Sequence, residues 1–212
     1  MPARIDPGLR SRLVEELVHR IGDDNPTTIR GLASAVGTST MTIYTQFGGM
    51  PGLWSAAREE AFRRLAAALA EVRERDDPGE QVMALASAYV ANAFAHPGLY
   101  LTMFDARHQL PDPRVADASF ERLIAAAERA RKAGRFRVDL DSGTAATRLW
   151  SVAHGLLMLA LTGALPPAAV AEHLPPMAHA LFVGFGDDPE AARASIAAGW
   201  QPSRVSGPTS RE

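Results

Sequence analysis

Cysteine is missing from this chain, which excludes disulfide bonds, thiolate zinc sites and a cysteine nucleophile. An excess of charge is missing too, because the formal net charge is −2 and residues 1–50 contain as many acidic residues as arginines. A protein with this balance is not a general nucleic-acid binder, so any DNA contact must come from a local patch. The chain has no HExxH spacing, no phosphate-binding glycine loop and no G-x-S-x-G motif. We therefore expect no metal, no cofactor and no enzymatic activity.

Signals for export or membrane insertion are weak as well. The first residues contain no apolar core of a secretory peptide, which favours a cytoplasmic protein. One segment, Leu149–Ala171, has no formally charged residue and would be long enough to span a bilayer. Pro166 and Pro167 interrupt it, however, and its uninterrupted part contains polar residues such as His154. A buried helix explains this segment better, and we expect no membrane partner.

Strand-like alternation is absent, and apolar residues instead recur at helical intervals between proline and glycine breaks. We predict an all-α fold of about nine helices. An N-terminal domain of three helices is expected over residues 1–50, and a larger helical domain over residues 51–201. The larger domain begins with a helix from Met50 to about Arg75, and its last substantial helix begins at Pro175. Residues 202–212 are turn-rich and almost free of apolar residues, which predicts a disordered tail.

Residues 28–53 contain the pattern of two short helices joined by a tight turn. Thr28 can cap the first helix, and Gly37 supplies the left-handed residue that ends it. Ser39 can cap the second helix, in which Ile43 and Phe47 lie four residues apart and point inward. The remaining side chains of the second helix then point outward. This arrangement is typical of a helix-turn-helix that reads DNA.

The outward side chains of the second helix are short, polar or aromatic and nearly uncharged, which suits contacts to base edges in a major groove. Tyr44 is placed to reach a phosphate, and the helix that begins at Met50 offers free backbone N–H groups and its positive dipole end to another. A buried position for Tyr44 is the alternative, although this residue lies off the stripe of Phe47. The expected DNA-binding residues are Thr28, Ser39, Thr40, Met41, Thr42, Tyr44, Thr45, Gln46 and Met50.

The order of residues in this segment resembles the helix-turn-helix of TetR-family transcriptional regulators over about residues 9–60. The residues that carry the resemblance are Gly37, Ser39, Thr42-Ile43-Tyr44, Phe47 and Leu53. A second similarity is the W-x3-H-G spacing of Trp150, His154 and Gly155, as in the WHG type of TetR C-terminal domain. The chain departs from the family at Met50, where many members carry lysine. The resemblance implies a regulator that binds a palindromic double-stranded DNA operator, usually as a repressor, and is released by a small, largely apolar effector.

Large apolar side chains lie in the helices where the resemblance places a ligand cavity. Aromatic and methionine side chains with a few polar groups are the usual lining of a small-molecule site, and His154 and Tyr100 would supply the polar contacts. The expected effector-binding residues are Tyr89, Phe94, Tyr100, Met103, Phe104, Trp150, His154 and Met158. The alternative is that these residues are plain core and that His154 is a hydrogen-bonded structural residue.

The helix from Leu149 to Leu161 is apolar on nearly all sides, so it has to cover two surfaces. In TetR-family proteins two helices of each subunit pair as a four-helix bundle across a two-fold axis, which implies a homodimer here. The expected residues of this seam are Leu156, Leu159, Gly163, Met177, Leu181 and Phe185. A purely intramolecular core is the alternative, but a two-fold protein also matches a palindromic operator.

A second class of function is compatible with the helical layout. An all-α small-molecule-binding protein or enzyme could share it, because helix pairs with a glycine turn occur in many proteins that never touch DNA. The joint pattern of motif and domain layout favours the regulator. Binding to random duplex DNA at low salt would separate the two classes.

Overall fold

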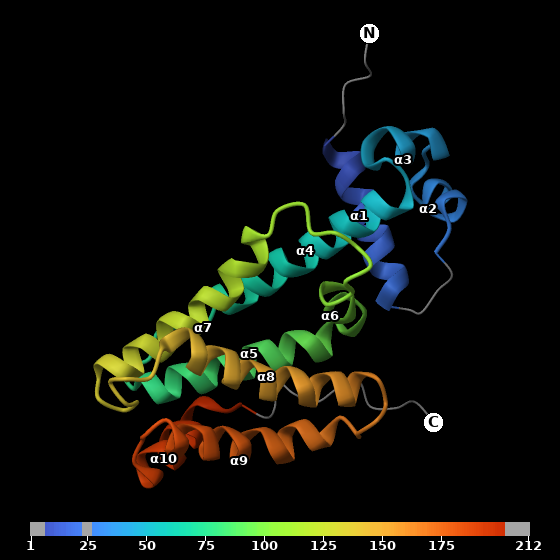
Figure 1. Ribbon diagram of the computed structural model, residues 1–212. Coiled ribbons are helices and arrows are strands. Elements are labelled where there is room, and N and C mark those ends of the chain that lie inside the picture. Colours follow the sequence, from blue (N-terminus) through green and yellow to red (C-terminus); the bar gives the residue numbers. More distant parts are fainter. Residues whose placement is uncertain (1–6, 23–26, 202–212) are drawn as a thin grey trace. The chain divides into compact units, whose positions relative to one another are not determined.

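The computed structural model describes residues 7–22 and 27–201, and over these ranges it consists of helices without a strand (Figure 1). The all-α prediction is therefore confirmed, and the expected tail over residues 202–212 lies outside the described residues. The helices are α1 (Pro7–Gly22), α2 (Ile29–Val36), α3 (Thr40–Phe47), α4 (Met50–Ala70), α5 (Pro78–Ala95), α6 (Pro97–Met103), α7 (Arg114–Lys132), α8 (Ser142–Leu161), α9 (Ala168–Gly184) and α10 (Pro189–Gly199).

Contacts along the chain divide it into two compact units. The first comprises Met1–Arg64 and His96–Ala116, and the second comprises Leu65–Ala95 and Asp117–Glu212. Helix α6 therefore belongs to the first unit, although α5 and α7, its neighbours in sequence, lie mostly in the second. The periodicity of apolar residues could not predict that α6 belongs to the first unit, because this placement depends on the packing of α6 against α1. The functional division into residues 1–50 and 51–201 stays a prediction.

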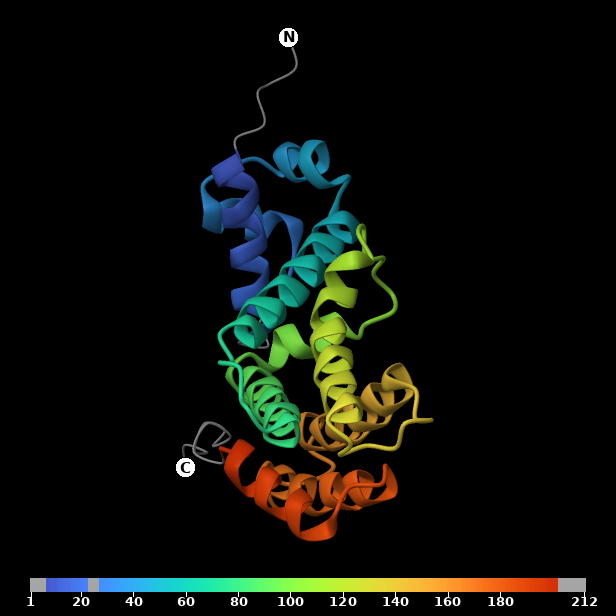
Figure 2. The ribbon, with the colours of Figure 1, turned by 90° about the vertical axis from the view of Figure 1, so that its left-hand side faces the viewer.

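The first unit has a core of aliphatic side chains from its first four helices. Helix α2 packs against both α1 and α3, and α1 also packs against α6 (Figure 2). Two glycines permit close approach of backbones: a Cβ on Gly52 would lie 1.7 Å from the carbonyl oxygen of Phe47, and one on Gly98 would lie 2.6 Å from Cγ2 of Ile21. The fully buried leucine and isoleucine residues of this unit are Leu13, Leu17, Leu32, Ile43 and Leu53.

Helix α4 ends at Ala70, several residues before the expected end near Arg75. The backbone of Arg75 is used by other parts of the second unit instead of continuing the helix. Its N–H donates to Oε1 of Gln81 at 2.8 Å, and its carbonyl accepts from Nη2 of Arg129 at 2.8 Å. Tertiary hydrogen bonds thus replace the last turn that local propensity favours.

In the second unit α5 packs against α8 and α10, and α9 packs against the same two helices. A partly buried polar cluster, centred on the buried side chains of Asp187 and Ser195, holds these helices together. Arg135 donates to both carboxylate oxygens of Asp187, at 2.6 and 2.8 Å, and to Oδ1 of Asp77 at 2.8 Å. The hydroxyl of Ser195 joins Asp77 at 2.5 Å. Paired charges with further hydrogen bonds make such burial tolerable.

Helix α9 differs from the sequence-based expectation of a new helix at Pro175. One helix runs from Ala168 to Gly184 with Pro175 and Pro176 inside it. Each proline removes an N–H from the helical ladder, but the buried stripe of Leu174, Ala178 and Phe182 holds the segment against its neighbours. Packing therefore outweighs the local cost of the prolines. Within the described residues no helix has the length and hydropathy needed to cross a membrane.

Candidate functional site

Both helices of the helix-turn-helix have the caps that their sequences predict. The Thr28 hydroxyl accepts from the N–H of Gly31 at 3.1 Å, and the Ser39 hydroxyl accepts from the N–H of Thr42 at 3.3 Å. At the other ends Gly37 and Gly48 adopt left-handed φ angles of 71° and 73°. Two side-chain caps and two left-handed glycines therefore define where α2 and α3 begin and end.

Helix α3 presents large side chains to solvent on one face and is anchored on the other. Ile43 is fully buried, whereas Met41 is 69% exposed and Tyr44 is 55% exposed. The alternative of Tyr44 as a core residue is therefore wrong. Two large exposed side chains, those of Met41 and Tyr44, on so short a helix are unusual for a surface without a binding role, and they suit contact with a partner.

The hydroxyl groups of this segment mostly serve the helix itself. The Thr42 hydroxyl bonds to those of Thr38, at 2.9 Å, and Ser39, at 3.1 Å, and the Thr45 hydroxyl donates to the carbonyl of Met41 at 2.8 Å. Of the expected DNA-binding residues, Thr40, Met41 and Tyr44 therefore project from α3. Ser39 and Thr42 shape the start of α3, and Thr28 caps α2.

Two further expected residues lie partly inside the first unit. Gln46 is half-buried, and its Oε1 is buried without a hydrogen-bond partner among the described residues. Met50 is half-buried and is the first residue of α4. The ring of Tyr44 lies against the turn before α4, since a Cβ on Gly49 would be 3.4 Å from its Cε1. Tyr44 and the first turn of α4 therefore adjoin each other.

In the second unit, three of the expected effector residues come together. Tyr89 of α5 accepts a hydrogen bond from Nε1 of Trp150 at 3.1 Å, and its hydroxyl lies 3.4 Å from Nδ1 of His154. The rings of Trp150 and His154 stack, with centroids 5.1 Å apart and planes 24° apart. Burial lowers the pKa of His154, which favours the neutral imidazole. We call Tyr89, Trp150 and His154 the α5–α8 cluster.

Sequence reasoning missed Phe120, which belongs beside this cluster. Its ring meets that of Trp150 edge to face, with centroids 6.1 Å apart. Phe120 is the only aromatic residue of α7, and that isolation on an otherwise alanine-rich helix was the available signal. The α5–α8 cluster is thus an aromatic group with a hydroxyl and an imidazole at its centre, the composition of a site for a small apolar molecule.

The other expected effector residues are divided between the units. Phe94 is buried and Met158 half-buried in the second unit. Tyr100, Met103 and Phe104 belong to the first unit, where Tyr100 and Met103 are fully buried. The Phe104 ring lies 5.1 Å from that of Tyr100 and 6.2 Å from that of Phe62. Within the first unit, this aromatic group has the character of core.

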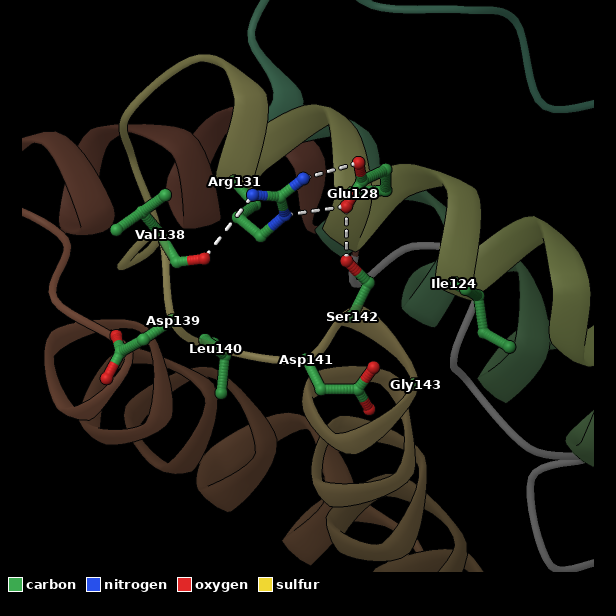
Figure 3. A pocket seen from close by; sticks show the side chains of 9 residues that line it. All are labelled: Ile124, Glu128, Arg131, Val138, Asp139, Leu140, Asp141, Ser142 and Gly143. Carbon is green, nitrogen blue, oxygen red and sulfur yellow. Dashed lines mark hydrogen bonds and ion pairs between the residues drawn. The ribbon is translucent and has the colours of Figure 1, made fainter.

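A surface hollow of about 480 Å³ lies where α7 leads into α8 (Figure 3). Two of its charged groups pair with each other, because Arg131 donates to both oxygens of Glu128, at 2.8 and 2.7 Å. The Ser142 hydroxyl donates to the same carboxylate at 2.6 Å. These hydrogen bonds, first from Arg131 and then from Ser142, lower the pKa of Glu128 to about 2. The hollow shares no residue with the expected effector site.

The expected dimer residues fall into two groups. Leu159 and Met177 are 45% and 42% exposed on the neighbouring helices α8 and α9. Gly163 is exposed in the loop between these helices, and Leu181 is half-buried on α9. Leu156 is buried within the chain at 8% exposure. Phe185 is 1% exposed and meets the Phe136 ring at 5.2 Å, so its assignment to a seam is corrected to the core of the chain. Val183, 37% exposed on α9, was not anticipated.

The family model of the tetracycline repressor-like C-terminal domain matches residues 82–182. This range includes all of the α5–α8 cluster as well as Phe120. Residues 82–182 thus form a tetracycline repressor-like C-terminal domain, and the chain is similar to TetR-family transcriptional regulators. These similarities support a DNA-binding transcriptional regulator with a ligand-binding domain over the alternative of an all-α protein without DNA binding.

Solved structures share this fold over most of their length. A protein of unknown function from Rhodococcus sp. RHA1 is 25% identical, with a TM-score of 0.73, over 88% of this chain and 100% of that one. RolR in complex with resorcinol is 21% identical, with a TM-score of 0.65, over 92% and 95%. The TetR-family regulator PfmR from Thermus thermophilus is 18% identical, with a TM-score of 0.55, over 94% and 100%. A comparison with curated proteins yields no match.

Proposed function

We propose that this protein is a homodimeric TetR-family repressor without catalytic activity, which binds a palindromic operator through α3 and leaves it when an effector occupies the α5–α8 cluster. Since its target is genomic DNA, its place of action is the cytoplasm. The observation that carries the DNA-binding part is the exposure of Met41, at 69%, and Tyr44, at 55%, on a short helix capped at both ends.

The exposed face of α3 has the chemistry of direct base reading. The Met41 side chain and the Thr40 methyl group can contact thymine methyl groups, and the hydroxyl of Thr40 can exchange hydrogen bonds with base edges. Tyr44 stands beside the start of α4, where unpaired backbone N–H groups attract an anion. A phosphate that receives the Tyr44 hydroxyl would therefore also meet the first turn of α4. Phosphate contacts of this kind orient the reading helix.

The α5–α8 cluster favours an effector that is mostly apolar and carries at least one hydrogen-bonding group. The rings of Phe120, Trp150 and His154 offer apolar surface, and the neutral imidazole of His154 can either donate or accept. Resorcinol, the ligand of the structurally similar RolR, has this character and is the first probe to test. Any effector that weakens operator binding must itself bind more weakly to the operator-bound protein.

Mutation of Tyr44 tests the role of α3. The operator is first located by footprinting next to the protein's own gene, and affinity is then measured for the wild type, Tyr44→Ala and Tyr44→Phe. We expect Tyr44→Ala to weaken binding to operator and to unrelated duplex alike, by about 1 to 3 kcal/mol. Tyr44→Phe keeps the ring and loses only the hydroxyl, so it reports the phosphate hydrogen bond. Because the side chain is exposed, stability should hardly change. Wild-type affinity in both folded variants would refute the interface.

A further inference from the structure

Arg10 belongs to α1 but makes its contacts with the end of α3. Its Nη1 donates to the carbonyl oxygen of Gln46 at 3.0 Å, and its guanidinium carbon lies 4.4 Å from the ring centroid of Phe47. Both targets lie in the last turn of α3. One side chain thus supplies a donor to a helix-end carbonyl and a cation to an aromatic face.

Helix α3 needs such support more than a long helix would. It has eight residues, and isolated helices of this length are unstable in water. Ile43 is its only buried residue, and a helix anchored at one point can roll about that point. Phe47 follows four residues later on the same side and is half-buried, so it is the natural second anchor. Arg10 covers this second anchor.

The other end of α1 also uses an arginine for contacts within the unit. Arg20 forms an ion pair with Glu16 at 2.7 Å and donates from Nη2 to the carbonyl oxygen of Gly31 in α2 at 3.2 Å. Arginines that a count of charges would assign to a DNA-binding patch therefore hold α1 against both helices of the reading motif.

We propose that Arg10 is a positioning residue for DNA recognition: it fixes the orientation of α3, and hence of Met41 and Tyr44, through Phe47 and the Gln46 carbonyl. This inference rests on the proposed reading role of α3. The competing role is a direct contact to a DNA phosphate, which the exposure of Arg10 would allow. The two roles differ in their salt dependence, because only a phosphate contact releases counterions from DNA.

The test uses the full-length protein, with operator affinity measured over a range of salt concentrations for Arg10→Met, Arg10→Lys and Phe47→Leu. Methionine keeps most of the length of the side chain but loses the donors and the charge. We expect Arg10→Met to lower affinity about tenfold, with the slope of log affinity against log salt unchanged. Arg10→Lys should recover part of the loss, since it restores the charge over the ring without the planar guanidinium. The loss in the double variant with Phe47→Leu should be less than the sum of the two single losses.

Several outcomes would overturn the inference. A slope that falls by about one unit per subunit in Arg10→Met would mark a phosphate contact instead. Full additivity with Phe47→Leu would show that Arg10 does not act through that ring. Affinities are expressed per folded protein from circular dichroism melts, so a purely stabilising role would leave them at the wild-type value and would also refute the inference. If Arg10→Met does not fold, the partial loss in Arg10→Lys decides. Tyr44→Ala separates the role of Arg10 from the proposed DNA-reading role of α3. If Tyr44→Ala weakens binding while Arg10→Met does not, the role of α3 stands and only the role of Arg10 is refuted.

Discussion

Replacing His154 by leucine tests the effector site most directly. Leucine keeps apolar bulk at this position of α8, but it removes the ring stacked on Trp150 at 5.1 Å and the nitrogen that lies 3.4 Å from the Tyr89 hydroxyl. An aromatic pair contributes about 0.5 to 1.5 kcal/mol beyond its area. The 3.4 Å hydrogen bond is at the long end of the usual range and contributes at most about 1 kcal/mol. We therefore expect a loss of about 1 to 2 kcal/mol in the free energy of unfolding.

The effect on the effector follows from the hydrogen bond that the imidazole would offer. A neutral hydrogen bond contributes about 1 kcal/mol net, which corresponds to a change of about fivefold in the dissociation constant. At effector concentrations near the wild-type dissociation constant, His154→Leu should therefore lose most of the release from operator. Operator affinity without effector should stay at the wild-type value, because the cluster lies in the second unit and the reading helix in the first.

The pH dependence provides a second signature of the same residue. Desolvation lowers the pKa of His154 in the folded protein, so below the unfolded-state value of about 6.5 the unfolded chain binds the proton more readily. This group therefore makes the wild type less stable as pH falls from about 6.5 toward the lowered value. The leucine variant lacks the group, so the stability advantage of the wild type over the variant should shrink between pH 7 and pH 5.

The assays are urea denaturation at several pH values and release from operator titrated with resorcinol and other small phenols. His173→Leu is the matched control, since His173 is exposed on α9. If His154→Leu unfolds or becomes monomeric, the residue is structural and the effector site loses its main support. If the variant still responds to an effector of the wild type with unchanged affinity, the polar contact lies elsewhere.

Two further predictions concern the phosphate contacts and the dimer. Met50→Lys adds a charge at the first residue of α4, so it should tighten operator binding and steepen the salt slope by about one unit per subunit; an unmoved slope would show that this helix start does not face the DNA backbone. Leu159→Asp and Met177→Asp each place a charge at a position that is 45% or 42% exposed in the subunit. We expect each variant to dissociate the proposed dimer in analytical ultracentrifugation while the subunit stays folded. The control is Val138→Asp, at a position that is 83% exposed in the loop before α8, and it should remain dimeric. An intact dimer in both variants would place the interface elsewhere.

Much of the reading motif was predictable from local chemistry. Thr28, Gly37 and Ser39 act as caps through groups within a few residues of themselves, so the start and end of α2 and the start of α3 follow from the order of residues. The inward direction of Ile43 and the outward direction of Tyr44 follow from the helical period in the same way. Asp141 caps α8 in the same local way, since its carboxylate accepts from the N–H of Thr144 at 2.7 Å.

Other features depended on contacts between residues far apart in the chain. Beyond the early end of α4, the backbone of Arg75 bonds to Gln81, six residues away, and to Arg129, which lies 54 residues away and outside any local window. The continuous α9 is caused by packing of its buried stripe, which outweighs Pro175 and Pro176. Phe185 has the spacing of a dimer residue but is covered by Phe136 of the same chain. Spacing within one helix indicates which residues share a face, and it does not identify what covers that face.

The sequence by itself thus determined the all-helical class, the capped helix pair and the outward face of α3, because each depends on interactions within about two helical turns. Only the tertiary structure decided which distant residues meet. It brought Phe120 to Trp150, returned α6 to the first unit and placed Arg10 on the last turn of α3. These contacts join residues tens of positions apart, and they form only where the packing of whole helices brings the side chains within reach.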